Sequence, residues 1–118
     1  MFCVKVKALS VNQAWQGKRY KTPAYKAYEQ ELLLMLPPHF KVPDGPLSAF
    51  YTFGLSSPLS DWDNPIKPFQ DVLQKKYNFD DRRITEAVVR KVLVKKGAEF
   101  IGFDIKTRLP GSQHITCQ

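Results

Sequence analysis

The sequence predicts a two-layer α+β domain, in which two helices pack on one face of a four-stranded mixed sheet. Some segments alternate apolar and polar residues, as β-strands do, and two other segments show the 3.6-residue period of a helix. Their order along the chain is strand, helix, strand, helix, strand, strand (β-α-β-α-β-β). Placing both helices on one face of one sheet is the simplest arrangement that buries the apolar faces. With 118 residues, the chain has the length of a single domain, which we expect to span residues 1–118.

The first part of the chain is predicted to form a strand, a loop and a helix. Residues 2–8 alternate in hydrophobicity, and residues 10–22 form a polar loop that is rich in basic and aromatic side chains. Thr22 is a suitable N-cap and Pro23 suits the first helical position, so a helix should begin here and end before Pro37. The apolar arc of this helix consists of Ala24, Tyr25, Tyr28, Leu32, Met35 and Leu36.

A second strand, at residues 47–56, and a second helix follow. Every second residue of the strand from Ala49 to Leu55 is apolar. Asn64 is a plausible N-cap for the helix, and Pro65 a plausible first residue. The apolar side of this helix carries Ile66, Phe69, Val72, Leu73 and Tyr77. Its polar side carries Lys67, Asp71, Gln74 and Lys75.

The remaining residues are predicted to form two strands and a tail. Residues 84–94 are rich in β-branched side chains on both faces, which is typical of a central strand. Lys96 and Gly97 supply a turn, and residues 99–107 are apolar at every second position. The tail from Pro110 onward is expected to be irregular.

Composition and charge indicate a globular protein with a polyanionic partner. Hydrophobic residues make up 43% and charged residues 25% of the chain, and no apolar run approaches the roughly 20 residues of a membrane span. The N-terminus lacks the pattern of a secretory signal, so we expect a cytoplasmic protein without a membrane partner. Neither cysteine has metal-ligand spacing, and no motif indicates a small-molecule cofactor. The net charge of +7 favours a polyanion such as nucleic acid.

A group of aspartates surrounds the second predicted helix. Asp61 and Asp63 lie between the end of a strand and the start of this helix, and Lys67 lies on its first turn. Asp80 and Asp81 follow the helix, where the chain turns back toward the sheet. Neighbouring carboxylates repel one another unless a cation balances their charge, and Mg²⁺ prefers such oxygen ligands. The pattern therefore indicates a magnesium site, at which a lysine can stabilise charge on a phosphate.

A purely structural interpretation of the same residues also stands. Asp63 and Asn64 could cap the helix, and Lys67 and Asp71 could form an exposed i,i+4 ion pair. The two aspartates at residues 80–81 could form a solvated turn. The spacing of these residues does not decide between the two interpretations.

The loop before the first helix is the best candidate for a DNA contact. Its basic residues are Lys18, Arg19 and Lys21, and they are interleaved with the aromatic residues Trp15 and Tyr20. Basic side chains can contact phosphates, and aromatic rings can stack on unpaired bases. Trp62, between the first two aspartates of the acidic group, could be a DNA-facing wedge or an anchor in the core.

Several motifs follow one another in a specific order. They are D-x-D-N-x-x-K at residues 61–67, an Asp-Val-Leu step at residues 71–73, and an aromatic-rich approach to the aspartates at residues 80–81. Together with the loop segments at residues 10–12 and 17–22, this order resembles the RusA family of Holliday junction resolvases.

The resemblance implies a magnesium-dependent crossover junction endodeoxyribonuclease that resolves four-way junctions by paired symmetric nicks in homologous recombination and DNA repair. It also implies a homodimer, with one active site per subunit, in a bacterial or phage-infected cell. The implied metal ligands are Asp61, Asp63 and Asp81, and Lys67 completes the catalytic set. Residues at supporting positions are Asn64, Asp71 and Asp80. Asn12 joins the basic loop as a DNA contact, and Ser60 stands where the family often has a basic residue.

Two other functions fit the same sequence. A non-catalytic DNA-binding protein, such as a phage regulator, would use the basic surface without cutting DNA. A basic structural protein with an acidic partner would show neither DNA affinity nor cleavage. Cleavage of a four-way junction in the presence of magnesium separates the first function from these two.

Overall fold

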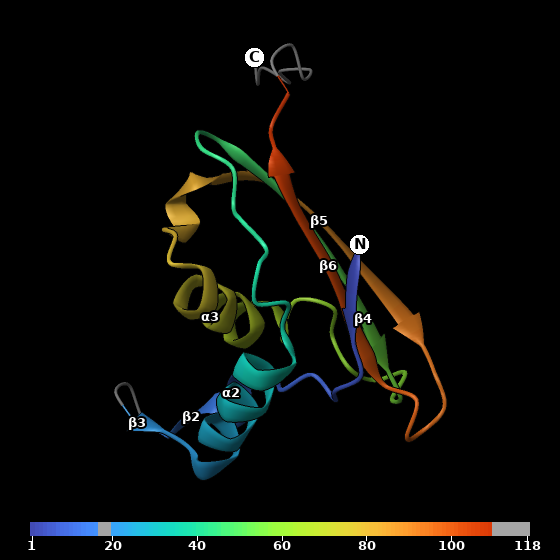
Figure 1. Cartoon of the computed structure of the whole chain (residues 1–118). Coiled ribbons are helices and arrows are strands. Elements are labelled where there is room, and N and C mark those ends of the chain that lie inside the picture. The colour runs from blue at the N-terminus through green and yellow to red at the C-terminus, as the bar shows by residue number, and fades with distance from the viewer. Residues whose placement is uncertain (17–19, 110–118) are drawn as a thin grey trace, which may run out of the picture.

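The computed structural model describes residues 1–16 and 20–109, which form a mixed sheet with helices on one face (Figure 1). The sheet strands are β1 (Phe2–Val4), β4 (Leu47–Leu55), β5 (Ile84–Leu93) and β6 (Phe100–Thr107). Their spatial order is β1-β6-β4-β5, with β4 and β5 parallel and the other pairs antiparallel. The helices that cover the sheet are α2 (Pro23–Met35) and α3 (Ile66–Tyr77). The predicted two-layer α+β architecture with a four-stranded mixed sheet is confirmed.

Four short elements were not predicted from the sequence. They are α1 (Val11–Ala14), β2 (Trp15–Gln16), β3 (Tyr20–Lys21) and the 3₁₀ turn η1 (Asp81–Arg83). The prediction of a polar loop over residues 10–22 was therefore wrong for residues 11–16 and 20–21, where α1 leads directly into β2 and β2 pairs antiparallel with β3. Elements of two to four residues are too short to show a hydrophobic period.

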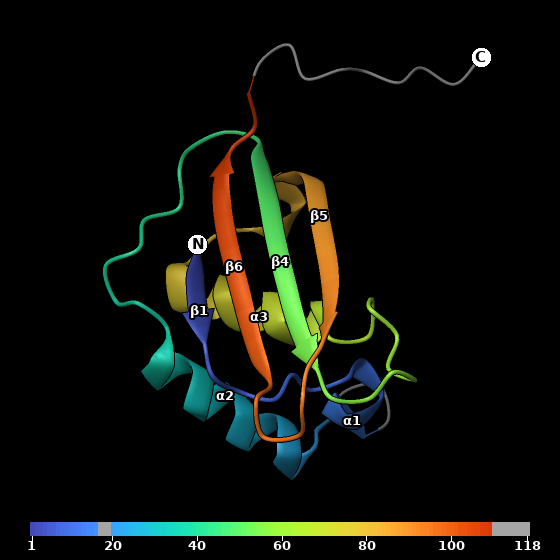
Figure 2. The same ribbon diagram turned by 90° about the vertical axis from the view of Figure 1, so that its right-hand side faces the viewer.

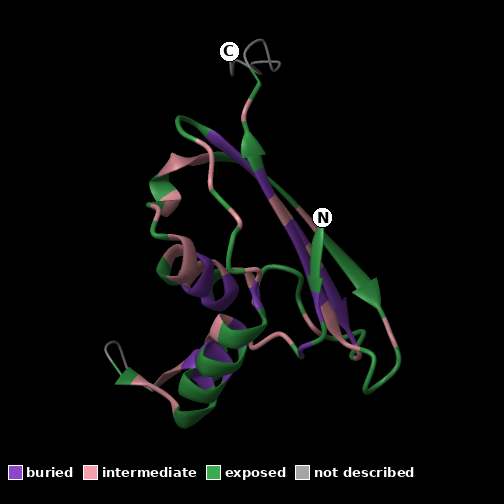
Figure 3. Ribbon diagram, viewed as in Figure 1, coloured by how far each residue is buried: buried purple, intermediate pink, exposed green. Residues whose placement is uncertain are grey.

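The hydrophobic core lies between the helices and the inner face of the sheet, where Figure 3 shows the buried residues. Phe69 of α3 is fully buried, and its ring lies 5.7 Å from that of Phe103 and 6.0 Å from that of Phe53, between centroids. The predicted inward positions of β4 and β6 are buried throughout. In α2, by contrast, Ala24 and Met35 are exposed, because they lie in the first and last turns of the helix.

The two main helices begin in different ways. Thr22 caps α2 as predicted, since its Oγ1 accepts a hydrogen bond from the Tyr25 N–H at 3.1 Å. The predicted Asn64 cap on α3 is wrong: α3 begins at Ile66, and Pro65 occupies the N-cap position without a side-chain hydrogen bond. In the described part of the chain, no helix is long and apolar enough to cross a membrane.

β5 lies at an edge of the sheet, next to β4 only (Figure 2). The prediction that residues 84–94 form a central strand was therefore wrong. Most of the strand is exposed, including Val88 at 40% and Val92 at 41%. β-branched side chains on both faces predict a strand, but they do not show how many neighbours that strand has.

Candidate active site

The polar side of α3 carries the first half of the candidate site. Phe69, Val72 and Leu73 are fully buried, so the helical period turns Lys67 and Asp71 toward the other side. Lys67 Nζ lies 2.9 Å from Asp71 Oδ1, one helical turn away. The hydrogen bond to Asp71 raises the pKa of the Lys67 ammonium group, which therefore stays charged at neutral pH.

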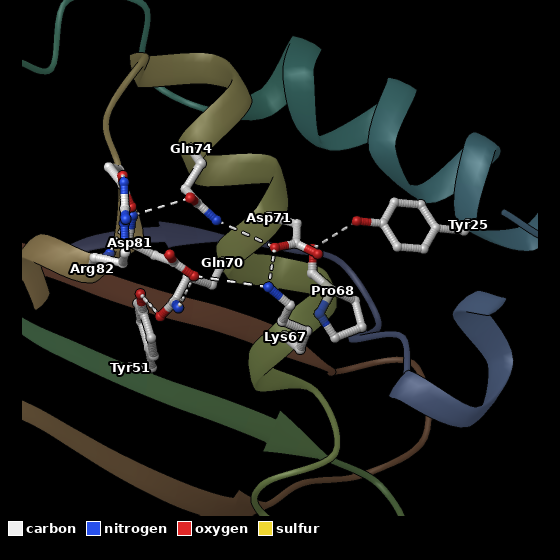
Figure 4. A network of polar contacts seen from close by, with 10 residues as sticks. Tyr25, Tyr51, Lys67, Pro68, Gln70, Asp71, Gln74, Asp81 and Arg82 are labelled. Atoms are coloured by element: carbon white, nitrogen blue, oxygen red, sulfur yellow. Dashed lines mark hydrogen bonds and ion pairs between the residues drawn. The ribbon is translucent and has the colours of Figure 1, made fainter. Parts of the chain in front are cut away.

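Two glutamines of α3 bring Asp81 to the same place (Figure 4). Gln70 Nε2 donates a hydrogen bond of 3.2 Å to Asp81 Oδ2. The backbone N–H of Asp81 donates one of 3.1 Å to Gln74 Oε1. Because both its carboxylate and its backbone are held, Asp81 faces Lys67, whose Nζ lies 3.8 Å from Oδ2.

The same glutamines extend this network in two directions. Tyr51, on β4, donates from its hydroxyl group to Gln70 Oε1 at 2.9 Å. Gln74 Nε2 donates to Asp71 Oδ1 at 3.2 Å. Burial, together with the negative charge of Asp81, raises the pKa of Tyr51, so its hydroxyl keeps its proton and acts as a donor. Each amide therefore has a fixed orientation, with a partner at each end.

Asp61 and Asp63 lie on the loop between β4 and α3, which is held through its backbone. Lys91 Nζ, on β5, donates hydrogen bonds to the carbonyl oxygens of Pro58 and Ser60, at 3.0 and 2.5 Å. Both aspartate side chains are exposed. No sequence motif indicated that Lys91 holds this loop.

The three predicted metal ligands do not form one cluster. Within residues 1–16 and 20–109, no three His, Cys, Asp or Glu side chains are arranged to hold a metal ion. Asp81 lies beside Lys67, whereas Asp61 lines a hollow of about 360 Å³ at the end of β4. The structure thus brings together Lys67, Asp71 and Asp81, and leaves Asp61 and Asp63 on the preceding loop.

Two of the predicted supporting residues have structural contacts. The Asn64 carbonyl oxygen accepts a hydrogen bond of 2.8 Å from the Val11 N–H, which joins α1 to the loop before α3. Asp80 accepts hydrogen bonds from the backbone N–H and the guanidinium group of Arg82, at 2.9 and 2.7 Å. These hydrogen bonds lower the pKa of Asp80, whose carboxylate caps η1.

Trp62 lies outside the core, with 55% of its surface exposed. It lines an open hollow with Ala87, Val89 and Lys91 of β5. The ring therefore rests beside the sheet edge while about half of it faces solvent. Of its two predicted roles, an anchor in the core does not fit this exposure, and contact with DNA stays a prediction.

The predicted DNA contacts are only partly described. Lys18 and Arg19 lie outside the described residues. Asn12, on α1, is exposed, and Tyr20 is 74% exposed. The side chains of Asn12 and Tyr20 are therefore accessible to a macromolecular partner, whereas Lys21 forms an ion pair within the chain.

Glu29 forms an ion pair with Lys21, and no sequence motif indicated this role of Glu29. Glu29 is 8% exposed on α2, and it accepts hydrogen bonds from Lys21 Nζ, at 2.8 Å, and from Lys75 Nζ. Burial favours the neutral form, but the two ammonium groups outweigh burial and lower the pKa of Glu29. The carboxylate thus ties β3 and α3 to α2. Its helical spacing from Tyr25 and Leu32, which places a charge on the buried arc, is the signal that could have identified it.

Comparison with known proteins adds no family assignment. No protein-family model matches the chain, and no curated protein is similar enough to match it. The relationship to the RusA family therefore stays a prediction from the motif residues.

Proposed function

We propose that the chain is a magnesium-dependent endonuclease for branched DNA, with four-way junctions as its substrate. The observation that carries the proposal is the position of Lys67 beside Asp81. The two residues lie on different elements, yet Nζ and Oδ2 are 3.8 Å apart, and Gln70 and Gln74 hold Asp81 in place. A carboxylate and an ammonium group that are held together at an accessible position can act on the same phosphate.

Asp81 is the first candidate ligand for Mg²⁺. Its side chain is 28% exposed. Mg²⁺ is commonly bound by one or two carboxylates, with water molecules and substrate phosphates as its other ligands. Asp61 and Asp63 would supply further carboxylates from the preceding loop, and this oxygen-only set of donors suits Mg²⁺. When bound, the ion would polarise the phosphate and lower the pKa of an attacking water molecule.

Lys67 is proposed to stabilise the negative charge that develops on the cleaved phosphate. Its side chain is 57% exposed, so the ammonium group is accessible to the backbone of bound DNA. The hydrogen bond to Asp71 keeps the ammonium group charged and restricts the orientation of the Lys67 side chain. Asp71 would therefore act as a positioning residue, through Lys67.

DNA would contact the surface around these residues. The net charge of +7 attracts phosphates, and the exposed rings of Tyr20 and Trp62 are suited to stacking on unpaired bases. A homodimer would carry two active sites, as paired nicks in two strands of a junction require. The proposed place of action is the cytoplasm of a bacterial or phage-infected cell.

A labelled synthetic four-way junction tests the proposal. The wild type should nick the junction with Mg²⁺, and should bind without nicking when a chelator is present. Lys67→Met should lower the single-turnover rate by about a hundredfold, the usual effect of removing one electrostatic stabiliser. Lys41→Met, which changes an exposed lysine before β4, is the matched control and should cut at the wild-type rate. An intact junction after incubation of the wild type with Mg²⁺ would contradict the proposal.

A non-catalytic DNA-binding protein is the second candidate function. Asp71 pairs with Lys67, and Asp80 pairs with Arg82, so these carboxylates also have the contacts of an ordinary folded surface. A protein of this kind would bind the junction equally with Mg²⁺ and with chelator, and the junction would stay intact. The same assay therefore separates the two candidates.

A further inference from the structure

β5 has a long edge with no neighbouring strand in the described part of the chain. The strand has ten residues and pairs only with β4. Its pairing with β4 is continuous from Ser48 to Leu55, because the one irregularity lies before Ser48. The exposed edge of a strand presents unpaired N–H and C=O groups, and natural sheets usually shorten, bend or cover such edges. β5 is long and contains neither proline nor glycine, but it carries Glu86, Arg90 and Lys91, so a strand that pairs with it must complement these charges.

The charges of β5 are arranged around a valine. On the face away from the helices, Glu86 and Arg90 stand two residues before and two residues after Val88. Val88 is 40% exposed, and both charged residues are exposed as well. This arrangement is complementary to itself when the strand direction is reversed.

We propose that β5 of a second copy of this chain pairs antiparallel with β5, on a two-fold axis that passes through Val88. Side chains that oppose each other in an antiparallel pair lie on the same face of the sheet. With this axis, Glu86 opposes the partner's Arg90, and Arg90 opposes the partner's Glu86. Val88 opposes the partner's Val88, and on the helix side Ala87 opposes the partner's Val89. Every contact then occurs twice, as a two-fold interface requires.

The charges select this register over its neighbours. An axis through Val89 would place Arg90 opposite the partner's Val88. An axis through Ala87 would place Glu86 opposite the partner's Val88. In either case the acidic and basic side chains would lose their opposing partners, so charge complementarity favours the axis through Val88. This inference rests on the proposed homodimer, but on none of the proposed chemistry.

Two charge reversals test the interface by sedimentation velocity, without DNA or metal. The wild type should sediment with twice the mass of one chain. Glu86→Arg and Arg90→Glu each place like charges opposite one another twice, so each should weaken dimerisation by about tenfold or more. An equimolar mixture of the two variants restores opposite charges at both positions. The mixture should therefore dimerise about as well as the wild type.

Matched controls carry the same changes in charge elsewhere. They are Glu31→Arg and Lys26→Glu, both at exposed positions of α2, and both should dimerise as the wild type does. Glu86→Arg also removes a hydrogen bond of 2.7 Å from Ser48, but recovery in the mixture would show that the variant is folded. A monomeric wild type would overturn the proposed homodimer. A wild-type dimer whose single variants dimerise equally well, or whose mixture fails to recover, would overturn the β5 interface alone.

Discussion

The side-chain amide of Gln70 donates a hydrogen bond of 3.2 Å to the carboxylate of Asp81. A residue in the middle of α3 thereby sets the direction of a carboxylate in the turn after that helix. The other end of the same amide accepts a hydrogen bond of 2.9 Å from the Tyr51 hydroxyl group. The orientation of Asp81 therefore depends on the contact between α3 and the sheet.

Replacing Gln70 with leucine should slow cleavage without weakening DNA binding. Leucine has a similar size but makes neither hydrogen bond, so Asp81 loses its fixed direction. We expect the single-turnover rate of junction cleavage at saturating Mg²⁺ to fall by about tenfold or more. Gln30→Leu, at an exposed position of α2, is the control and should cut at the wild-type rate. Equal rates for Gln70→Leu and the wild type would show that this amide does not position Asp81 for the reaction.

Glu29→Gln should lower the stability of the fold most at neutral pH. Although burial opposes it, pairing with Lys21 and Lys75 lowers the pKa of Glu29 below its ordinary value of 4.5. A carboxylate with a lowered pKa in the folded state stabilises the protein at pH values above 4.5, and this contribution is lost as the pH falls through the lowered pKa. In urea unfolding at pH 7, we expect the variant to lose about 1 to 2 kcal/mol.

The pH dependence provides the control for this variant. The difference in unfolding free energy between the wild type and Glu29→Gln should shrink as the pH is lowered toward 3, because the wild-type carboxylate becomes protonated. A difference that is the same at pH 7 and pH 3 would mean that the loss of charge pairing is not the cause.

Trp62 is expected to contact the bases of bound DNA. The chain has two tryptophans, so the Trp15→Phe variant has fluorescence from Trp62 alone. A four-way junction added with a chelator should quench this fluorescence. Trp62→Ala should weaken binding by about 1 to 3 kcal/mol, whereas Leu59→Ala, at an exposed position on the same loop, should not. Unchanged fluorescence at saturating DNA would place Trp62 outside the DNA contact.

Local signals were sufficient to predict most of the fold. Thr22 and Pro23 identify the start of α2, and the apolar period of α3 identifies its buried side, because both signals depend on neighbouring residues. The edge position of β5 could not be predicted in this way. The pattern of a strand describes its two faces, whereas its neighbours depend on the whole sheet.

The candidate site, too, could be predicted from the sequence only where it depends on neighbouring residues. The spacing from Asp61 to Lys67 is local and visible in the sequence. The contact of Asp81 with Gln70 is not, because it depends on how the chain returns after α3. That return begins at Asn78, which ends the helix in the left-handed conformation, with φ of 53°. Asparagine is one of the few residue types that readily adopt this conformation at the end of a helix, so Asn78 was a signal for the end of α3, whereas the path of the following turn could not be read from the residue types.

The role of Asp81 in metal-dependent cleavage is tested most directly by the Mg²⁺ dependence of single-turnover junction cleavage. The comparison needs the wild type, Asp81→Asn, and Asp44→Asn as an exposed control. We predict that all three bind the junction equally in chelator, and that Asp44→Asn cuts at the wild-type rate. Asp81→Asn should cut more than about a hundredfold more slowly, since even indirect changes at metal sites cost roughly 10-fold to 100-fold. Cleavage by Asp81→Asn at the wild-type rate, with the same Mg²⁺ midpoint, would contradict this role.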